Sequence, residues 1–179
     1  DLRPAEILAR ANSELCRENE ELMFVTMLCG ILDLGQGELT IANGGHLSPV
    51  LLSPDSFPVA VETPPGLVLG VRNDFVYADT AVTIPAGGTL VLFTDGVTET
   101  SGEGGSLFGM GGVLAMLSEA AGSTPESLVR ELVARARRSS TFPADDIAIL
   151  ALEYRGGGGG GQAAAPPSSG RKSAGSPTG

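Results

Sequence analysis

A single carboxylate stands where a hydrophobic run ends, in the segment LFTDGVTET at residues 92–100. Asp95 follows the apolar run and precedes Gly96. Both are ordinary turn residues, because Asp bonds to its own backbone and Gly tolerates a positive φ. A plain turn is therefore the simplest interpretation of the stretch taken alone. The alternative is that Asp95 is a ligand presented at the tip of a strand.

A second group of carboxylates lies at the edge of another apolar segment. Asp145 and Asp146 come directly before IAILAL. They would meet Asp95 at one rim if the two segments were antiparallel neighbours in a sheet. Clustered carboxylates repel each other unless a cation lies among them, and oxygen ligands suit Mg²⁺ or Mn²⁺. Spacing alone slightly favours two unrelated turns with solvated acids.

The chain has one histidine, His46, in the segment ANGGH. Imidazole titrates near neutral pH, so a general acid is one possible role. A histidine that holds the turn by hydrogen bonds is the favoured interpretation. A Ser-His-Asp triad with Ser48 is disfavoured, because no nucleophile-elbow motif surrounds this serine. The glycine-rich stretch GEGGSLFGMGG matches neither a Walker motif nor a dinucleotide fingerprint, so a loop is predicted there.

The elements that must position these residues follow from the hydrophobic periodicity. An amphipathic helix is predicted over residues 4–19, with Ile7, Leu8, Ala11 and Leu15 on one face. A capping-box start at residues 123–126 opens the second of two later helices, which has an apolar stripe. The predicted strands cover residues 23–34, 38–43, 48–53, 75–84, 89–96 and 145–154, and the predicted loops cover 54–66 and 100–112. This order indicates an α+β fold of mostly antiparallel strands with helices on the sheet faces.

Composition sets the limits of the domain. Residues 155–179 are rich in Gly, Pro and Ser and cannot bury enough apolar surface to order themselves, so a disordered tail is predicted after a domain at 1–154. The formal net charge of −10 argues against a nucleic-acid partner. The acidic residues are compatible with cation binding, although surface solubility explains most of them.

Targeting signals and cysteine usage favour a cytoplasmic protein. No apolar run reaches the ~20 residues that a membrane span needs, and the opening DLRPAE is not a signal peptide. Cys16 and Cys29 do not form a metal-type pair, so free buried thiols in a reducing cytosol are expected. The chain does not open with Met, which suggests that it begins inside a larger protein.

Several segments together resemble one family. FVTMLCGILDLGQGELTIANGGHLSPVLL, followed by GLVLG, LVLFTDGVTET, LFG and DDIAILAL, resembles the SpoIIE/RsbU-type serine phosphatases of the metal-dependent protein phosphatase (PPM) family. The resemblance runs in order from residue 4 to about residue 154. It implies a four-layer αββα sandwich with a site for two Mn²⁺ or Mg²⁺ ions at one end, where metal-activated water hydrolyses phosphoserine or phosphothreonine.

The resemblance also assigns roles to individual residues. Asp95 matches the metal ligand of the TDG motif, and Asp145 matches the metal ligand that opens the DDI motif. Asp146 and Gly96 fill neighbouring positions that would support these ligands. His46 lies where the family usually shows a similar Asn-small-Gly-His stretch. Val68 departs from the family, which usually has a Pro there, and this puts the local turn in doubt.

Two aspartate motifs that the family carries upstream, GGDxYD and DVxGHG, do not occur in this chain. They would supply about half of the metal ligands and the strands that carry them. The chain is therefore expected to be the C-terminal part of a phosphatase domain, inactive alone, with an exposed sheet edge.

Two functions remain open. The leading one is a cytoplasmic bacterial serine/threonine phosphatase that acts on a phosphorylated anti-anti-sigma-like (STAS) protein, with a possible homodimer through upstream regions. The alternative is a non-catalytic phosphatase-like module that binds a signalling partner. A haloacid-dehalogenase-like phosphatase is disfavoured, because position 93 is Phe93 where that motif requires Asp.

Overall fold

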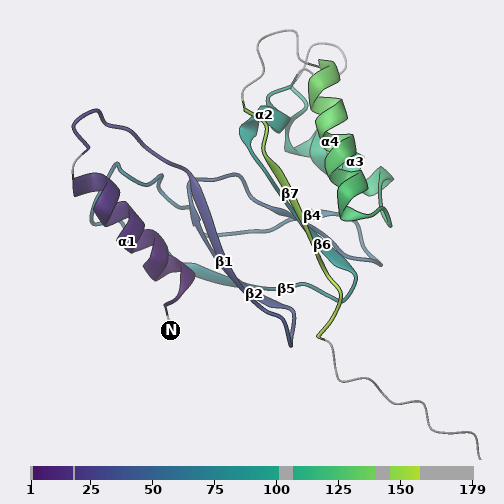
Figure 1. Ribbon diagram of the computed structural model, residues 1–179, viewed down its shortest axis with the longest axis horizontal. Helices are drawn as coiled ribbons and strands as arrows, with labels where there is room; N and C mark the ends of the chain where they lie inside the picture. Colours follow the sequence, from purple (N-terminus) through teal and green to yellow (C-terminus); the bar gives the residue numbers. More distant parts are fainter. Residues whose placement is uncertain (1, 18, 101–106, 140–145, 158–179) are drawn as a thin grey trace, which may run out of the picture.

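The computed structural model describes residues 2–17, 19–100, 107–139 and 146–157. These residues form two antiparallel sheets that pack face to face, with α1 on one outer side and α2, α3 and α4 on the other (Figure 1). The strands run in the order β1-β2-β5 in one sheet and β4-β3-β6-β7 in the other. The helices are α1 (Pro4–Arg17), α2 (Asp95–Thr98), α3 (Gly109–Glu119) and α4 (Pro125–Ser139). The strands are β1 (Met27–Asp33), β2 (Glu38–Gly44), β3 (Val50–Leu52), β4 (Val59–Ala60), β5 (Asp79–Thr83), β6 (Gly88–Phe93) and β7 (Ile149–Tyr154).

Three clusters of apolar side chains fill the spaces between these layers. One lies between α1 and the sheet of β1, β2 and β5, one between the two sheets, and one between the second sheet and the helices α2 to α4. Their fully buried members include Leu8, Ala42 and Leu69 in the first, Ile41 and Ile84 in the second, and Val91, Val97 and Leu132 in the third. The predicted four-layer αββα arrangement is therefore confirmed.

The β1–β2 hairpin is closed by one carboxylate. Asp33 Oδ1 accepts hydrogen bonds from the amides of Gly35 (2.7 Å) and Gln36 (3.1 Å), and the Asp33 carbonyl accepts one from Gly37 (2.8 Å). Gly37 has a φ of +71°, a conformation that costs glycine little. The turn fixes a register in which Met27 pairs with Gly44, at the end of β2 that leads to His46.

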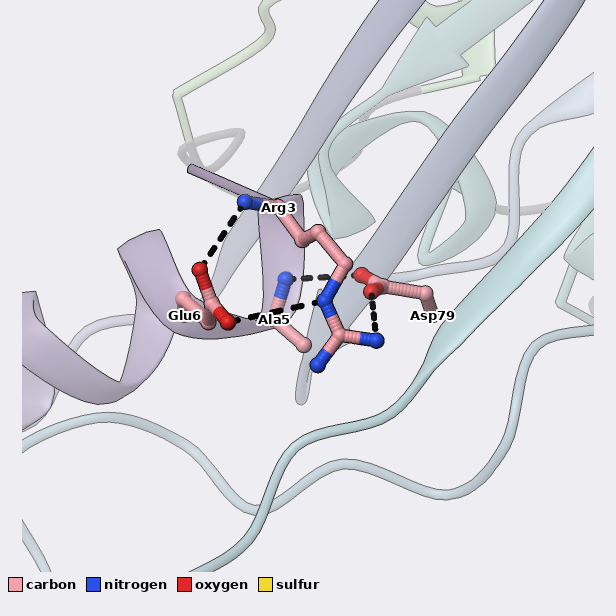
Figure 2. Close-up of polar contacts among 4 residues, drawn as sticks. All are labelled: Arg3, Ala5, Glu6 and Asp79. Atoms are coloured by element: carbon pink, nitrogen blue, oxygen red, sulfur yellow. Dashed lines mark hydrogen bonds and ion pairs between the residues drawn. The ribbon is translucent and has the colours of Figure 1, made fainter. Parts of the chain in front are cut away.

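The start of α1 is fixed by a residue from the sheet (Figure 2). The residue before the helix is Arg3, whose side chain cannot accept a hydrogen bond from the free amides of the first turn. Asp79 Oδ1 of β5 accepts one from the Ala5 amide instead, at 2.7 Å. Arg3 Nη1 lies 3.7 Å from Asp79 Oδ2, an ion pair rather than a hydrogen bond. The Arg3 amide donates to Glu6 Oε2 at 3.2 Å, and this bond lowers the pKa of Glu6.

The buried face of α1 differs from the predicted one. Leu8 is buried as predicted, but Leu15 is exposed and the polar residue Asn12 is fully buried. Asn12 Oδ1 accepts a hydrogen bond from the Gly70 amide, and Asn12 Nδ2 donates to the Arg72 carbonyl, both at 2.9 Å. Asn12 therefore fastens the helix to the loop that precedes β5.

Several predicted boundaries were wrong. β1 begins at Met27 rather than residue 23, and β4 lies inside the predicted loop 54–66. β5 begins at Asp79 rather than residue 75, because its pairing with β2 ends at Ala42–Asp79. The end of the predicted strand 89–96 is the short helix α2.

The glycine-rich stretch is only partly the predicted loop. Residues 101–106 lie outside the described residues, but α3 already begins at Gly109. A side chain at position 112 would overlap the ring of Phe108, so glycine permits this close contact. Gly112 therefore serves packing, whereas Gly109 and Gly111 have open space around them.

The remaining predictions have mixed outcomes. Both cysteines are free, but they are half-buried rather than buried. Burial raises the pKa of the Cys29 thiol, and the charge of Asp79 raises it further. Among the described residues, no helix is long and apolar enough to cross a membrane. The predicted tail falls mostly on residues 158–179, which lie outside the described part, so it stays a prediction.

Replacing Asp79 with Ala should lower the free energy of unfolding by about 1–2 kcal/mol, because the first turn of α1 loses its acceptor and a favourable charge. Urea denaturation measures this loss. The matched control is Asp74→Ala, because the Asp74 side chain is 83% exposed and its ion pair with Arg72 lies at the surface. The control should change stability by less than about 0.5 kcal/mol. Equal losses in the two variants would contradict the role given to Asp79.

Candidate functional site

A cavity of about 320 Å³ brings two of the predicted site residues together. It lies between the turn that follows β2 and the junction of β6 with α2. Its lining residues are Thr26, Gly45, His46, Leu47, Thr94, Asp95, Thr98 and Glu99. His46 and Asp95 are far apart in sequence and share this cavity because their strands belong to the two facing sheets.

Hydrogen bonds fix the backbone of Asp95, and its carboxylate faces solvent. It is the first residue of α2, and its Oδ1 accepts a hydrogen bond from the Gly96 amide at 3.0 Å. The Asp95 carbonyl accepts from the Thr98 hydroxyl (3.0 Å) and the Glu99 amide (2.9 Å). Burial of Gly96 and Val97 anchors the short helix to the core. The side chain of Asp95 itself remains exposed.

Thr94 joins this junction to the segment that leads into β7. Its hydroxyl donates to the Asp146 carbonyl at 2.8 Å and accepts from the Ala148 amide at 2.9 Å. The Thr94 amide also donates to the Ala148 carbonyl at 3.0 Å. These bonds extend the β6–β7 ladder beyond the pair Phe93–Ile149. They hold the backbone of Asp146 beside the residue that precedes Asp95.

The predicted carboxylates are thus partly assembled in the described residues. β6 and β7 are antiparallel neighbours, so Asp95 and Asp146 lie at the same edge of the sheet, as the sequence argument required. The side chain of Asp146 is exposed. Asp145 lies outside the described residues. The ligand roles of Asp95 and Asp145, and the supporting roles of Asp146 and Gly96, stay predictions.

The turn that carries His46 is held by Asn43 rather than by the imidazole. Asn43 Oδ1 accepts from the His46 amide (2.8 Å), and Asn43 Nδ2 donates to the His46 carbonyl and to Thr63 Oγ1 (both 3.0 Å). His46 Nδ1 is buried and has no hydrogen-bond partner within the described ranges. A buried polar atom without a partner is uncommon, and this one is shielded from solvent although His46 lines the cavity. Nδ1 therefore forms no hydrogen bond within the described ranges that could hold the turn, although the sequence favoured such a role for the ring.

Two glycines let this turn fit against the loop around Val68. Gly45 has a φ of +75° and contacts Val68, so it is glycine for both conformation and space. A side chain at Gly66 would overlap the Asn43 carbonyl. The valine at position 68 is therefore accommodated by a glycine on the facing turn.

The sequence patterns assign no role to the other polar residues that line the cavity, among them Thr94, Thr98 and Glu99. Glu99 follows Asp95 by four residues, and residues at this spacing face each other on a helical turn. That spacing was the available signal for a second carboxylate beside Asp95.

The donors in this cavity fit a hard divalent cation. Asp95 and Glu99 supply carboxylate oxygens, and Mg²⁺ is usually held by one or two carboxylates together with water and substrate phosphate. Within the described part of the chain, no group of three or more His, Cys, Asp or Glu residues is close enough to hold a metal. These residues therefore suit an open site that leaves several positions to water, substrate or further ligands.

A larger cavity, of about 410 Å³, lies at the opposite end of β6. It is bordered by Thr89, Leu117, Glu126 and Glu153 among others, and the carboxylate of Glu153 is already paired with Arg155 at 3.0 Å. None of the predicted site residues reaches it. Size alone does not make it the site, because the chemistry-bearing residues converge on the smaller cavity.

Comparison with known proteins decides the family. Residues 1–155 match the model of the family described as Stage II sporulation protein E (SpoIIE). The chain belongs to the SpoIIE family. The curated relative "Phosphoserine phosphatase RsbU" of Bacillus subtilis (strain 168) is 29% identical to this SpoIIE-family chain over 106 residues. The match covers 59% of this chain and 32% of RsbU, so the chain spans about a third of that relative.

Solved structures show the fold of the family. The SiaA-PP2C domain of Pseudomonas aeruginosa superposes with a TM-score of 0.71 at 23% identity, covering 85% of this chain and 61% of that one. The RsbU and RsbW domains of Rv1364c from Mycobacterium tuberculosis give a TM-score of 0.68 at 23% identity, covering 81% and 40%. At these identities the likeness establishes that this SpoIIE-family chain shares the PP2C-type fold.

Replacing Asn43 with Ala should lower the free energy of unfolding by about 2–3 kcal/mol, because three hydrogen bonds in a partly buried turn lose their partner. Chemical denaturation followed by circular dichroism measures the loss. Thr63→Val is the matched control, since it removes only one of the three bonds and should cost about 1 kcal/mol. A loss in the Asn43 variant no larger than in the control would show that Asn43 does not hold the turn.

Proposed function

We propose that this chain is part of a metal-dependent protein serine/threonine phosphatase that hydrolyses phosphoserine or phosphothreonine on a regulatory partner protein. The observation that carries the proposal is the edge of the second sheet. There, Asp95 and the Asp146 segment are joined through Thr94 beside a cavity that also contains His46. Membership of the SpoIIE family and the name of its relative RsbU, a phosphoserine phosphatase, support this chemistry.

The proposed roles follow the geometry of the described residues. Asp95 would hold Mn²⁺ or Mg²⁺ with its solvent-facing carboxylate, and we propose Asp145 as the second ligand. Gly96 would orient Asp95 through the hydrogen bond to Oδ1, and Asp146 would support the site through its backbone. When bound, the cations would supply an activated water molecule and stabilise charge on the phosphoryl oxygens.

His46 is the candidate proton donor in this cavity. Its backbone is held in the turn between β2 and β3 by two hydrogen bonds with Asn43. Because Nδ1 is buried, the proton for a leaving seryl or threonyl oxygen would come from Nε2, the other ring nitrogen. We therefore assign His46 to leaving-group protonation rather than to metal binding.

The unpaired strand edges support the proposal that further strands precede this segment. Four described strands, β1 and β5 in one sheet and β4 and β7 in the other, each have one unpaired edge. Leu150 and Leu152 of β7 lie opposite Leu92 and Leu90, on the face toward the other sheet, yet they are 57% and 37% exposed. Exposed apolar strand edges are normally covered. We propose that residues preceding this chain cover them and supply the missing aspartates, which would make residues 1–154 the C-terminal part of the domain.

The partner is proposed from the relatives. RsbU and RsbW domains occur together in Rv1364c, which links this fold to regulatory protein partners in that protein. We propose a phosphorylated STAS-type anti-anti-sigma protein as substrate, in the cytoplasm, with dimerisation through upstream regions. The formal net charge of −10 argues against a nucleic-acid substrate.

Replacing Asp95 with Asn should lower Mn²⁺-dependent phosphatase activity by more than about 100-fold, since loss of a direct ligand exceeds the 10–100-fold typical of a supporting residue. The assay is phosphate release from a phosphoserine peptide by the protein as its gene encodes it. Asp55→Asn, a change in the exposed turn after β3, is the control and should retain activity. Unchanged activity in the Asp95 variant would reject this site. Absence of activity in the unmodified protein would favour the alternative, a non-catalytic module that binds a signalling partner.

A further inference from the structure

Thr94 occupies a capping position without acting as a local cap. It is the residue before α2, with φ −82° and ψ 164°, the backbone conformation expected there. A threonine at this position usually accepts a hydrogen bond from an amide in the first turn of its own helix. Thr94 makes no such side-chain bond. The amide of Gly96 is taken by Asp95 Oδ1 instead.

The hydroxyl is used across the sheet instead. It donates to the Asp146 carbonyl and accepts from the Ala148 amide, so its proton and one lone pair both serve one segment far away in sequence. With the bond from the Thr94 amide to the Ala148 carbonyl, three hydrogen bonds link one residue to the chain between 146 and 148. Regular strand pairing uses backbone hydrogen bonds alone. The two hydroxyl bonds therefore restrain the distance between Thr94 and residues 146–148 in addition to the backbone pairing.

This link lies directly beside the proposed ligand. Asp95 follows Thr94 in sequence, and the Asp146 backbone is bound to the Thr94 hydroxyl. Loss of the Thr94 hydroxyl would therefore remove two bonds that hold the Asp146 segment near Asp95 without touching either carboxylate. Residues that orient metal ligands in this way typically affect metal affinity by 10–100-fold.

We propose that Thr94 is a positioning residue of the metal site, which sets the separation between Asp95 and the backbone at Asp146 through its hydroxyl. The proposal rests on the metal-dependent function proposed above and adds to it a residue with no ligand atom of its own. The competing explanation is that the hydroxyl only strengthens the end of the β6–β7 ladder.

The test compares three variants of the protein as its gene encodes it. Thr94→Val removes the hydroxyl and keeps the shape, and Thr94→Ser keeps the hydroxyl. Thr89→Val makes the same replacement at a buried position of β6, at the end of the strand remote from Asp95. Calorimetric titration with MnCl₂ gives the metal affinity, and amide hydrogen exchange at Ala148 reports whether the link is intact.

The Thr94→Val variant should bind Mn²⁺ at least about 10-fold more weakly than the unmodified protein, with faster exchange of the Ala148 amide. Thr94→Ser should restore both within about threefold, and Thr89→Val should match the unmodified protein in both. Faster exchange at Ala148 with unchanged Mn²⁺ affinity would overturn the proposal in favour of a ladder-strengthening role. Unchanged exchange would show that the hydroxyl link is not formed, and would overturn it as well.

Two further outcomes keep the test decisive. If Thr94→Val does not fold, the unmodified protein is measured with and without MnCl₂. Saturating metal should then slow exchange at Ala148 and leave Ala42, in the other sheet, unchanged; no slowing at Ala148 overturns the proposal. If the unmodified protein binds no Mn²⁺, the metal-dependent function and the positioning role both fail. Binding without phosphatase activity rejects the proposed function alone, because the affinity comparison still stands.

Discussion

The pairing of β6 with β7 is the constraint on which the rest of the structure depends. Along β6, Leu90 and Leu92 face the other sheet, whereas Val91 and Phe93 face the helices, so this strand contributes to two cores at once. A shift of one residue would exchange the two faces, which makes the register costly to change. The same register ends at Phe93 and Ile149 and thereby fixes where Asp95 and Asp146 emerge. The packing of apolar side chains on β6 therefore determines the position of the candidate site.

The sequence was informative where period and composition decide the outcome. Alternating apolar residues predicted most strands, and the stripe containing Leu128 and Leu132 predicted the buried face of α4, which the structure confirms. The α+β class followed from the order of elements, and carboxylates at two strand ends suggested an oxygen-ligand site. That these ends are neighbours was not predictable from spacing, because antiparallel pairing between segments so distant in sequence depends on the packing of both sheets.

Short-range rules failed where polar side chains connect distant segments. Asn12 lies among apolar residues of α1 and is buried because it bonds to the loop before β5. Asp79 is a strand residue that serves the first turn of a helix, and Thr94 is a helix-start residue that serves a strand. Each has a common local role in sequence-based rules, and each uses its hydrogen-bonding groups elsewhere. Such choices become visible only when the partner segments are placed in space.

The close approach of Gly66 to the Asn43 carbonyl makes the connection after β4 less tolerant of change than the connection between β3 and β4. From residue 54 to 57 the chain is exposed, so added residues only lengthen a surface connection. At residue 66 the backbone lies where even a methyl group would overlap β2, and Leu69 three residues later is fully buried. An affinity tag or a fluorescent insertion is therefore best placed near Asp55. Residues 66–70 should not tolerate an insertion, and position 66 should not tolerate a residue larger than glycine.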